Sequence, residues 1–97
     1  MNILEHMMHL YDEALEELMD AEKYAKCAEK SESAEDKSMY RSLGKQELDH
    51  ELMLERAADK LFPGNSTDPM HTVWHHLKKH LHGWRAKIEM RMSDNKG

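Results

Sequence analysis

The sequence predicts an all-α fold, consisting of a long antiparallel helical hairpin followed by a third helix. Two observations support this prediction. The 97 residues include only four glycines and two prolines, and apolar residues recur at helical spacing with no alternating strand pattern. The length suits a single domain, 1–97, with the hairpin over 2–62 and the C-terminal helix over about 69–92.

Local signals set the limits of the hairpin helices. The first helix extends to residue 30 without glycine or proline, and Asn2 is a suitable N-cap. A polar break at 31–33 separates it from the second helix. Ser33 followed by Asp36 resembles a capping box, although Glu or Gln is the usual partner. We therefore expect the second helix to begin at Ala34.

The end of the second helix and the limits of the third are also marked. Pro63-Gly64 breaks the second helix after Phe62. Asp68 is an N-cap residue, and Pro69 suits the first position of a helix. The third helix should then reach about residue 92, leaving 93–97 as a frayed tail.

Composition excludes several classes of protein. No apolar stretch is long enough to span a membrane, and a formal net charge of -5 argues against binding to nucleic acid. The single cysteine, Cys27, excludes an internal disulfide and suits a reducing compartment. The N-terminal residues lack the layout of a signal peptide, so we expect a cytoplasmic protein.

The hairpin alone covers only one side of each apolar helix face, so the remaining apolar surface requires another partner. The simplest solution is a homodimer, in which two hairpins pair across a two-fold axis into a four-helix bundle. A higher homo-oligomer, such as a ring of dimers, would contain several copies of this pair. The alternative is a compact three-helix monomer in which the third helix folds back over the hairpin.

Three polar residues interrupt the apolar rows of the hairpin. The row of the first helix is Ile3, Met7, Leu10, Ala14, Glu17, Ala21, Tyr24 and Ala28, and that of the second is Tyr40, Leu43, Glu47, His50, Leu54, Ala57 and Leu61. Glu17 is the exception in the first row, and Glu47 and His50 are the exceptions in the second. Spacing of three residues places Glu47 and His50 on one helix face.

The three exceptions are also expected at one level of the hairpin. Glu17 and Glu47 each lie fifteen residues from Glu32, which is roughly 22 Å along each helix if the chain turns there. Buried carboxylates must be paired, protonated or bound to metal, and neither row supplies a Lys or Arg. We therefore interpret Glu17, Glu47 and His50 as metal ligands. The alternative is a monomer with solvent-facing carboxylates and a core histidine.

Glu17, Tyr24 and the Glu-x-x-His motif of Glu47 and His50 resemble the ferritin-like di-iron carboxylate superfamily. The match spans about 10–62 and contains the motif once, as in the short encapsulated ferritins. The resemblance implies a ferroxidase that oxidises Fe(II) with dioxygen at a centre holding two irons per dimer interface. It also implies that Glu47 bridges the metals while Glu17 and His50 are terminal ligands.

Other features leave alternatives open. Per dimer, the four negative charges of the carboxylates balance the four positive charges of two ferrous ions, and the two imidazoles are neutral. Manganese or zinc would also suit these ligands. Tyr24 is either a hydrogen-bond partner of a ligand or a core aromatic residue. The resemblance implies an encapsulating shell as a partner, but the final residues lack a capsid-targeting peptide, so encapsulation is not expected.

Two further functions compete with the ferroxidase. One is a metal-free interaction module that dimerises through the same rows. The other is a divalent-metal binder without redox chemistry that uses histidines of the third helix, because pairs four residues apart can chelate a metal. The third-helix histidines are His71, His75, His76, His80 and His82.

Overall fold

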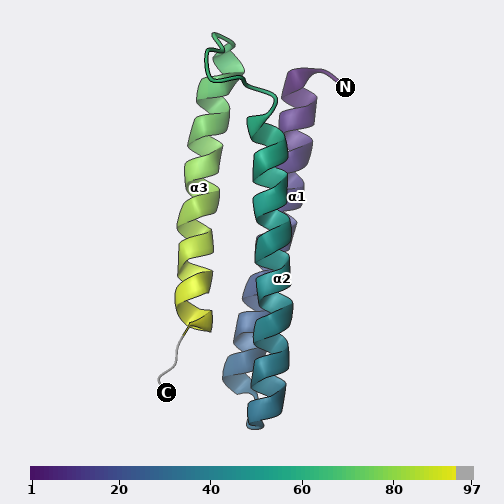
Figure 1. Cartoon of the computed structure of the whole chain (residues 1–97), viewed down its shortest axis with the longest axis vertical. Helices are drawn as coiled ribbons and strands as arrows, with labels where there is room; N and C mark the ends of the chain where they lie inside the picture. Colours follow the sequence, from purple (N-terminus) through teal and green to yellow (C-terminus); the bar gives the residue numbers. More distant parts are fainter. Residues whose placement is uncertain (94–97) are drawn as a thin grey trace.

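The computed structural model describes residues 1–93, which form three α-helices and no strand (Figure 1). They are α1 (Ile3–Lys30), α2 (Ala34–Asp59) and α3 (Pro69–Met92). The all-helical prediction is therefore confirmed for this part of the chain. None of these helices combines the length and apolar character needed to cross a membrane.

Side-chain caps fix the starts of the hairpin helices. The Asn2 side chain accepts a hydrogen bond from the Glu5 amide at 2.8 Å, and the Glu5 carboxylate accepts one from the Asn2 amide at 3.1 Å. This reciprocal pair is a complete capping box. At the start of α2, the Ser33 hydroxyl accepts from the Asp36 amide at 3.2 Å. Both caps satisfy amides that the first helical turn leaves without partners.

The second helix ends at Asp59, three residues before its expected end at Phe62. The Phe62 amide donates to the Asp59 carbonyl at 3.0 Å, so the chain tightens into a turn with bonds between residues three apart. Pro63 explains this change, because the residue before a proline is disfavoured in the α-helical conformation.

The third helix begins and ends close to the expected positions. The Asp68 carboxylate caps it by accepting from the Met70 amide at 2.9 Å, and Pro69 occupies the first turn, where its missing amide hydrogen costs little. The helix continues to Met92. Residues 94–97, most of the expected frayed tail, lie outside the described part of the chain.

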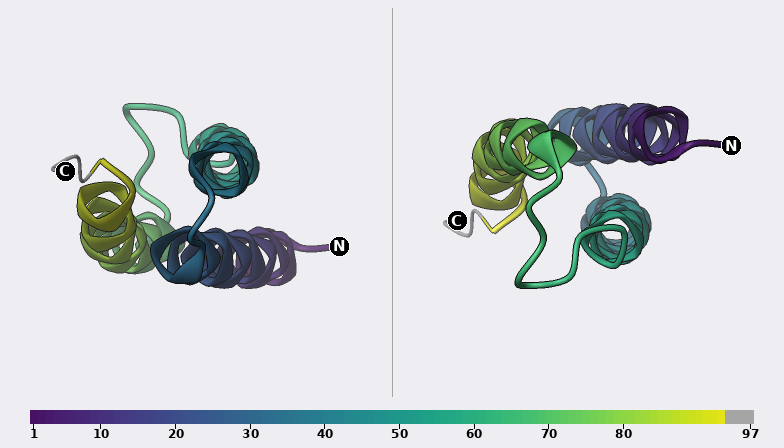
Figure 2. Two further views of the ribbon diagram at one scale, coloured as in Figure 1. Left: turned by 90° about the horizontal axis from the view of Figure 1, so that it is seen from below. Right: turned by 90° about the horizontal axis from the view of Figure 1, so that it is seen from above.

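The three helices lie at the corners of a triangle and extend over 51 × 23 × 15 Å (Figure 2). The hairpin turns at 31–33, and the loop after α2 returns α3 along the hairpin, where it lies beside α1. The folded-back arrangement of the third helix therefore occurs within a single chain. The four-helix bundle would require a second chain.

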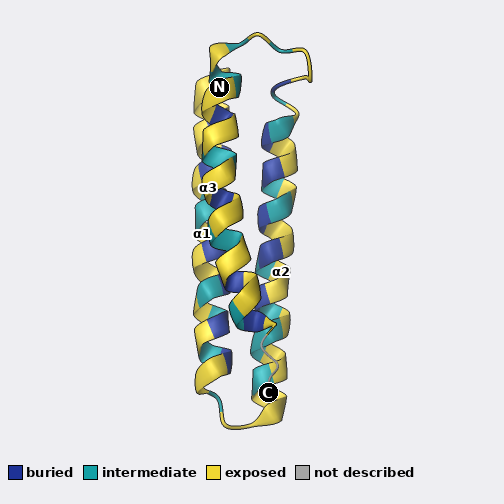
Figure 3. Ribbon diagram, turned by 90° about the vertical axis from the view of Figure 1, so that its left-hand side faces the viewer, coloured by how far each residue is buried: buried dark blue, intermediate teal, exposed yellow. Residues whose placement is uncertain are grey.

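Buried positions run along the side of each helix that faces the other helices (Figure 3), and most of them are apolar. Half of the buried α1 residues are alanines, namely Ala14, Ala21, Ala25 and Ala28, and their small side chains allow the neighbouring helices to approach closely. From α3 the core receives Trp74, Leu81 and Ile88, all at most 2% exposed. Together these residues make one continuous core between the hairpin and α3.

Replacing Gly83 by alanine is expected to stabilise the protein by about 1 kcal/mol, because alanine has a higher helix propensity than glycine. Gly83 is exposed within α3, and an added Cβ would meet nothing within 4 Å. Thermal unfolding should show a rise of several degrees in the melting temperature. A lower melting temperature would indicate that this surface of α3 is covered by another chain in solution.

Candidate metal centre

Glu17 of α1 and Glu47 and His50 of α2 come together at one level of the hairpin. One ligand atom from each residue lies within 4.8 Å of the other two. His50 Nδ1 is 3.2 Å from Glu47 Oε1 and 3.7 Å from Glu17 Oε1. Glu17 and Glu47 lie at the same level because each is fifteen residues from Glu32, where the hairpin turns. We call these three residues the triad.

The triad lies at the surface of the single chain rather than in its core. The side chains of Glu17, Glu47 and His50 are 27%, 21% and 57% exposed. Together with Met53 and Leu54, the triad residues Glu17 and His50 border a depression of about 300 Å³. An ion or a second chain can therefore reach the triad from solvent.

The Glu47 carboxyl perturbs the neighbouring carboxyl of Glu17. The Glu47 carboxyl, which can share a hydrogen-bonded proton with Glu17, is the main reason that the pKa of Glu17 rises to about 7. Partial burial and the negative charge of Glu47 add to the rise, whereas His50 opposes it. Without a bound cation, Glu17 is therefore mostly protonated below about pH 7. A cation that displaces this proton would relieve the repulsion between the two carboxylates.

The donor set suits a divalent transition metal. Two carboxylates and an imidazole provide oxygen and nitrogen donors, which favour iron, manganese or zinc over soft copper(I). The described residues contain no other group of three His, Cys, Asp or Glu side chains with this proximity. Three protein donors leave coordination positions open for water, a substrate or ligands from another chain.

Tyr24 does not contact the triad within the chain. It lies seven residues after Glu17, which is roughly 10 Å along α1. Its ring stacks against that of Tyr40, with 6.3 Å between ring centroids and 26° between the planes. In the single chain Tyr24 is thus an aromatic packing residue, and a hydrogen bond to a metal ligand remains a prediction for the assembled protein.

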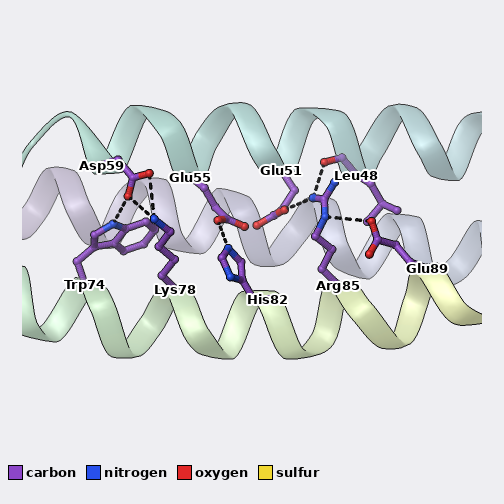
Figure 4. Close-up of polar contacts among 9 residues, drawn as sticks. All are labelled: Leu48, Glu51, Glu55, Asp59, Trp74, Lys78, His82, Arg85 and Glu89. Carbon is purple, nitrogen blue, oxygen red and sulfur yellow. Dashed lines mark hydrogen bonds and ion pairs between the residues drawn. The ribbon is translucent and has the colours of Figure 1, made fainter.

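A row of polar contacts between α2 and α3 was missed by the sequence-based reasoning (Figure 4). Its members on α2 are Glu51, Glu55 and Asp59, and their partners on α3 are Trp74, Lys78, His82 and Arg85. Glu51 and Glu55 are 0% and 2% exposed, so two acids lie in the core. The signal was the spacing of four residues among Glu51, Glu55 and Asp59, which places these acids in one row along α2.

The two buried acids of this row, Glu51 and Glu55, are a second pair of carboxyls close enough to share a proton. The carboxyls of Glu51 and Glu55 point toward each other, and each has one oxygen that lacks a partner among residues 1–93 unless a proton lies between them. Burial, followed by the Glu55 carboxyl, raises the pKa of Glu51 to about 8 against the opposing effect of Arg85. At the other end of the row, burial favours protonation of Asp59, but hydrogen bonds from Trp74 and Lys78 outweigh it and lower its pKa.

The third-helix histidines have individual contacts and do not form a metal site. His71 stacks on Phe62 with 5.2 Å between ring centroids, and His82 Nε2 lies 2.6 Å from Glu55 Oε1. His80 Nδ1 lies 3.3 Å from the Tyr11 hydroxyl. Nowhere in residues 1–93 do these histidines gather into a group of three possible ligands. A metal site on α3 would therefore have to use a pair of histidines four residues apart.

Comparison with protein-family models, curated proteins and solved structures finds no match to this chain. The resemblance to ferritin-like proteins therefore depends on the quoted motif residues. The geometry of the triad is a separate observation, because it comes from the fold of this chain.

Proposed function

We propose that this chain is a ferritin-like di-iron protein that oxidises Fe(II) with dioxygen at a centre formed between two copies of the chain. The observation that supports this proposal is the triad, in which Glu17, Glu47 and His50 converge from two helices. A cytoplasmic location would keep Cys27 reduced and supply Fe(II). Manganese and zinc are alternative occupants with the same ligand preferences.

Charge supports two metals per pair of chains. Each triad contributes two carboxylates, so two triads carry four negative charges, which balance two divalent cations. Two metals at one centre can hold both reactants of a redox step in place. Each Fe(II) loses one electron, and dioxygen takes up the two electrons together with two protons to give hydrogen peroxide.

The face around the triad is suited to cover by a second copy. The apolar side chains of the α2 row beside the triad remain partly exposed. These are Tyr40, Leu43, Leu54 and Leu61, and Met53 next to them is 64% exposed. The α2 residues that α3 contacts through hydrogen bonds are different ones, namely Leu48, Glu51, Glu55 and Asp59. Pairing through the uncovered face would bury apolar surface and join two triads in one step.

The triad residues have separable roles in this proposal. In the assignment implied by the resemblance, Glu47 would be the ligand shared by both metals. Glu17, whose pKa is raised to about 7, is partly protonated at neutral pH without a metal and would release this proton when Fe(II) binds. His50 supplies the neutral nitrogen ligand, and its 57% exposed side chain can turn toward an arriving ion.

Glu47→Ala is expected to abolish Fe(II) binding and oxidation above the buffer rate. The wild-type protein should bind about one Fe(II) per chain in anaerobic titration and form ferric product rapidly when air is admitted. Asp49→Ala is the matched control, because Asp49 is an exposed acid two residues away on the same helix. Removal of one carboxylate ligand should weaken binding far more than loss of a nearby surface charge.

Equal oxidation rates in the wild-type and Glu47→Ala proteins would contradict the ferroxidase proposal. Tight binding of Fe(II) or Zn(II) by the triad without oxidation would instead indicate a metal-binding module. Association of two chains with no binding of either metal would indicate a protein-interaction module. Subunit mass and metal content should therefore be measured on the same sample, purified without a metal-affinity column.

A further inference from the structure

Arg85 of α3 holds α2 at two points (Figure 4). Its Nη1 atom donates to the Leu48 carbonyl at 2.8 Å and to Glu51 Oε1 at 2.5 Å. On its own helix, Arg85 Nε lies 3.3 Å from Glu89 Oε2. The guanidinium is 16% exposed, so these contacts lie mostly out of water and orient the side chain firmly.

The two contact points belong to the helical turn that carries two triad residues. Glu47 is followed directly by Leu48, and His50 is followed directly by Glu51. Arg85 therefore contacts the buried positions of this turn, Leu48 and Glu51, and the ligands Glu47 and His50 occupy the more exposed positions beside them. Because a helical turn is rigid, its rotation about the α2 axis sets where both ligand side chains begin.

We propose that Arg85 is a positioning residue for the metal centre, fixing the rotation of the α2 turn from which Glu47 and His50 reach the ion. This inference rests on the proposed metal-binding function of the triad. It gives α3 a function beyond core packing, because its contacts with the buried positions of this α2 turn then control the geometry of the ligands. A more distant ion pair between α2 and α3, Lys78 with Asp59 at 2.9 Å, is more than two turns away along α2 and lacks this effect.

The sign of the effect separates positioning from simple electrostatics. A nearby guanidinium repels a cation, so if Arg85 acted only through its charge, Arg85→Met would strengthen cation binding. If Arg85 positions the turn, the same substitution weakens binding despite removing a positive charge. Residues that orient metal ligands typically contribute ten- to a hundredfold to affinity. For Arg85, which acts through the backbone and Glu51, we expect about tenfold.

The test compares Co(II) binding by the wild-type, Arg85→Met, Arg85→Lys and Lys78→Met proteins. Co(II) is suitable because it binds the same nitrogen and oxygen ligands, and its visible spectrum reports ligand geometry. We expect Arg85→Met to bind Co(II) about tenfold more weakly with an altered spectrum, and Arg85→Lys to recover part of the affinity. Lys78→Met should match the wild type in both measurements. Unchanged or stronger binding by Arg85→Met would overturn the inference.

A second variant keeps the test informative if Arg85→Met folds poorly. The double variant Glu51→Leu with Arg85→Met replaces a buried ion pair by apolar side chains, which proteins often tolerate. It should fold and still bind Co(II) weakly, because the contact to the Leu48 carbonyl is absent. Wild-type affinity in this variant would overturn the inference. Failure of the wild-type protein to bind Co(II) would overturn the proposed function as well.

Discussion

Leu54→Asp is expected to convert the paired protein into a monomer, with the dissociation constant of the pair raised by at least a hundredfold. Leu54 borders the depression beside Glu17 and His50, at the centre of the proposed pairing face. The new carboxylate would lose its water on pairing and would add one negative charge from each chain to a face that already carries the triad carboxyls. Loss of about 3 kcal/mol of association free energy corresponds to the hundredfold change.

Light scattering or analytical ultracentrifugation in metal-free buffer measures this change. Met19→Asp is the matched control, because Met19 is 59% exposed and lines a different depression on α1, with Cys27 and nearby lysines. The control should remain paired. Loss of Fe(II) oxidation should accompany the loss of pairing in Leu54→Asp, because a monomer brings only one triad to the reaction. A wild-type protein that is monomeric would contradict the proposed arrangement.

The sequence predicted much of the fold because its helix signals are local. Asn2 and Asp68 supply caps through side chains that bond to amides within three residues, and the break at 31–33 separates two long helical segments. The exception was the end of α2, where Pro63 acts on the residue before it as well as on itself. Local chemistry thus accounts both for the helix limits that were predicted correctly and for the early end of α2.

The triad was also accessible to sequence reasoning, because one assumption about the turn aligns Glu17 with Glu47. The same reasoning could not decide which face of α2 is buried within the chain. It chose the row containing Leu43, Leu54 and Leu61, which remains partly exposed. The buried row includes Glu51 and Glu55, which pattern reading assigns to the surface.

These acids are buried because α3 supplies Arg85 and His82 to them. That contact depends on how α3 folds back, which is a tertiary property that helical spacing does not encode. The consequence is that α2 presents two acidic faces with different partners. One face meets a cationic helix of its own chain, and the other carries Glu47 and is open to an external cation.

Acidification is expected to have opposite effects on the metal-free and the metal-bound protein. The pKa values of Glu17 and Glu51 rise from 4.5 to about 7 and about 8 in the folded chain. The folded state therefore binds protons more tightly than the unfolded state. The resulting stability is fully present below about pH 4.5 and is lost as the pH rises through 7 and 8. In the presence of a chelator, the melting temperature should increase by several degrees from pH 8.5 to 5.

Cation binding has the opposite dependence, because a metal must displace the proton from Glu17. Below its pKa of about 7, affinity should fall about tenfold per pH unit, or about a hundredfold between pH 7 and pH 5. The stabilisation by a fixed Zn(II) concentration, measured as a shift in melting temperature, should therefore shrink on acidification.

Two substitutions separate the contributions to these opposite trends. Glu17→Gln should reduce the pH dependence of the metal-free protein and also remove most of the Zn(II) stabilisation. Glu51→Gln should reduce the pH dependence of the metal-free protein alone, because Glu51 lies on the α3 side of the helix and is not a member of the triad. If Zn(II) stabilises the wild-type and Glu17→Gln proteins equally at pH 7.5, then the cation does not bind at the triad.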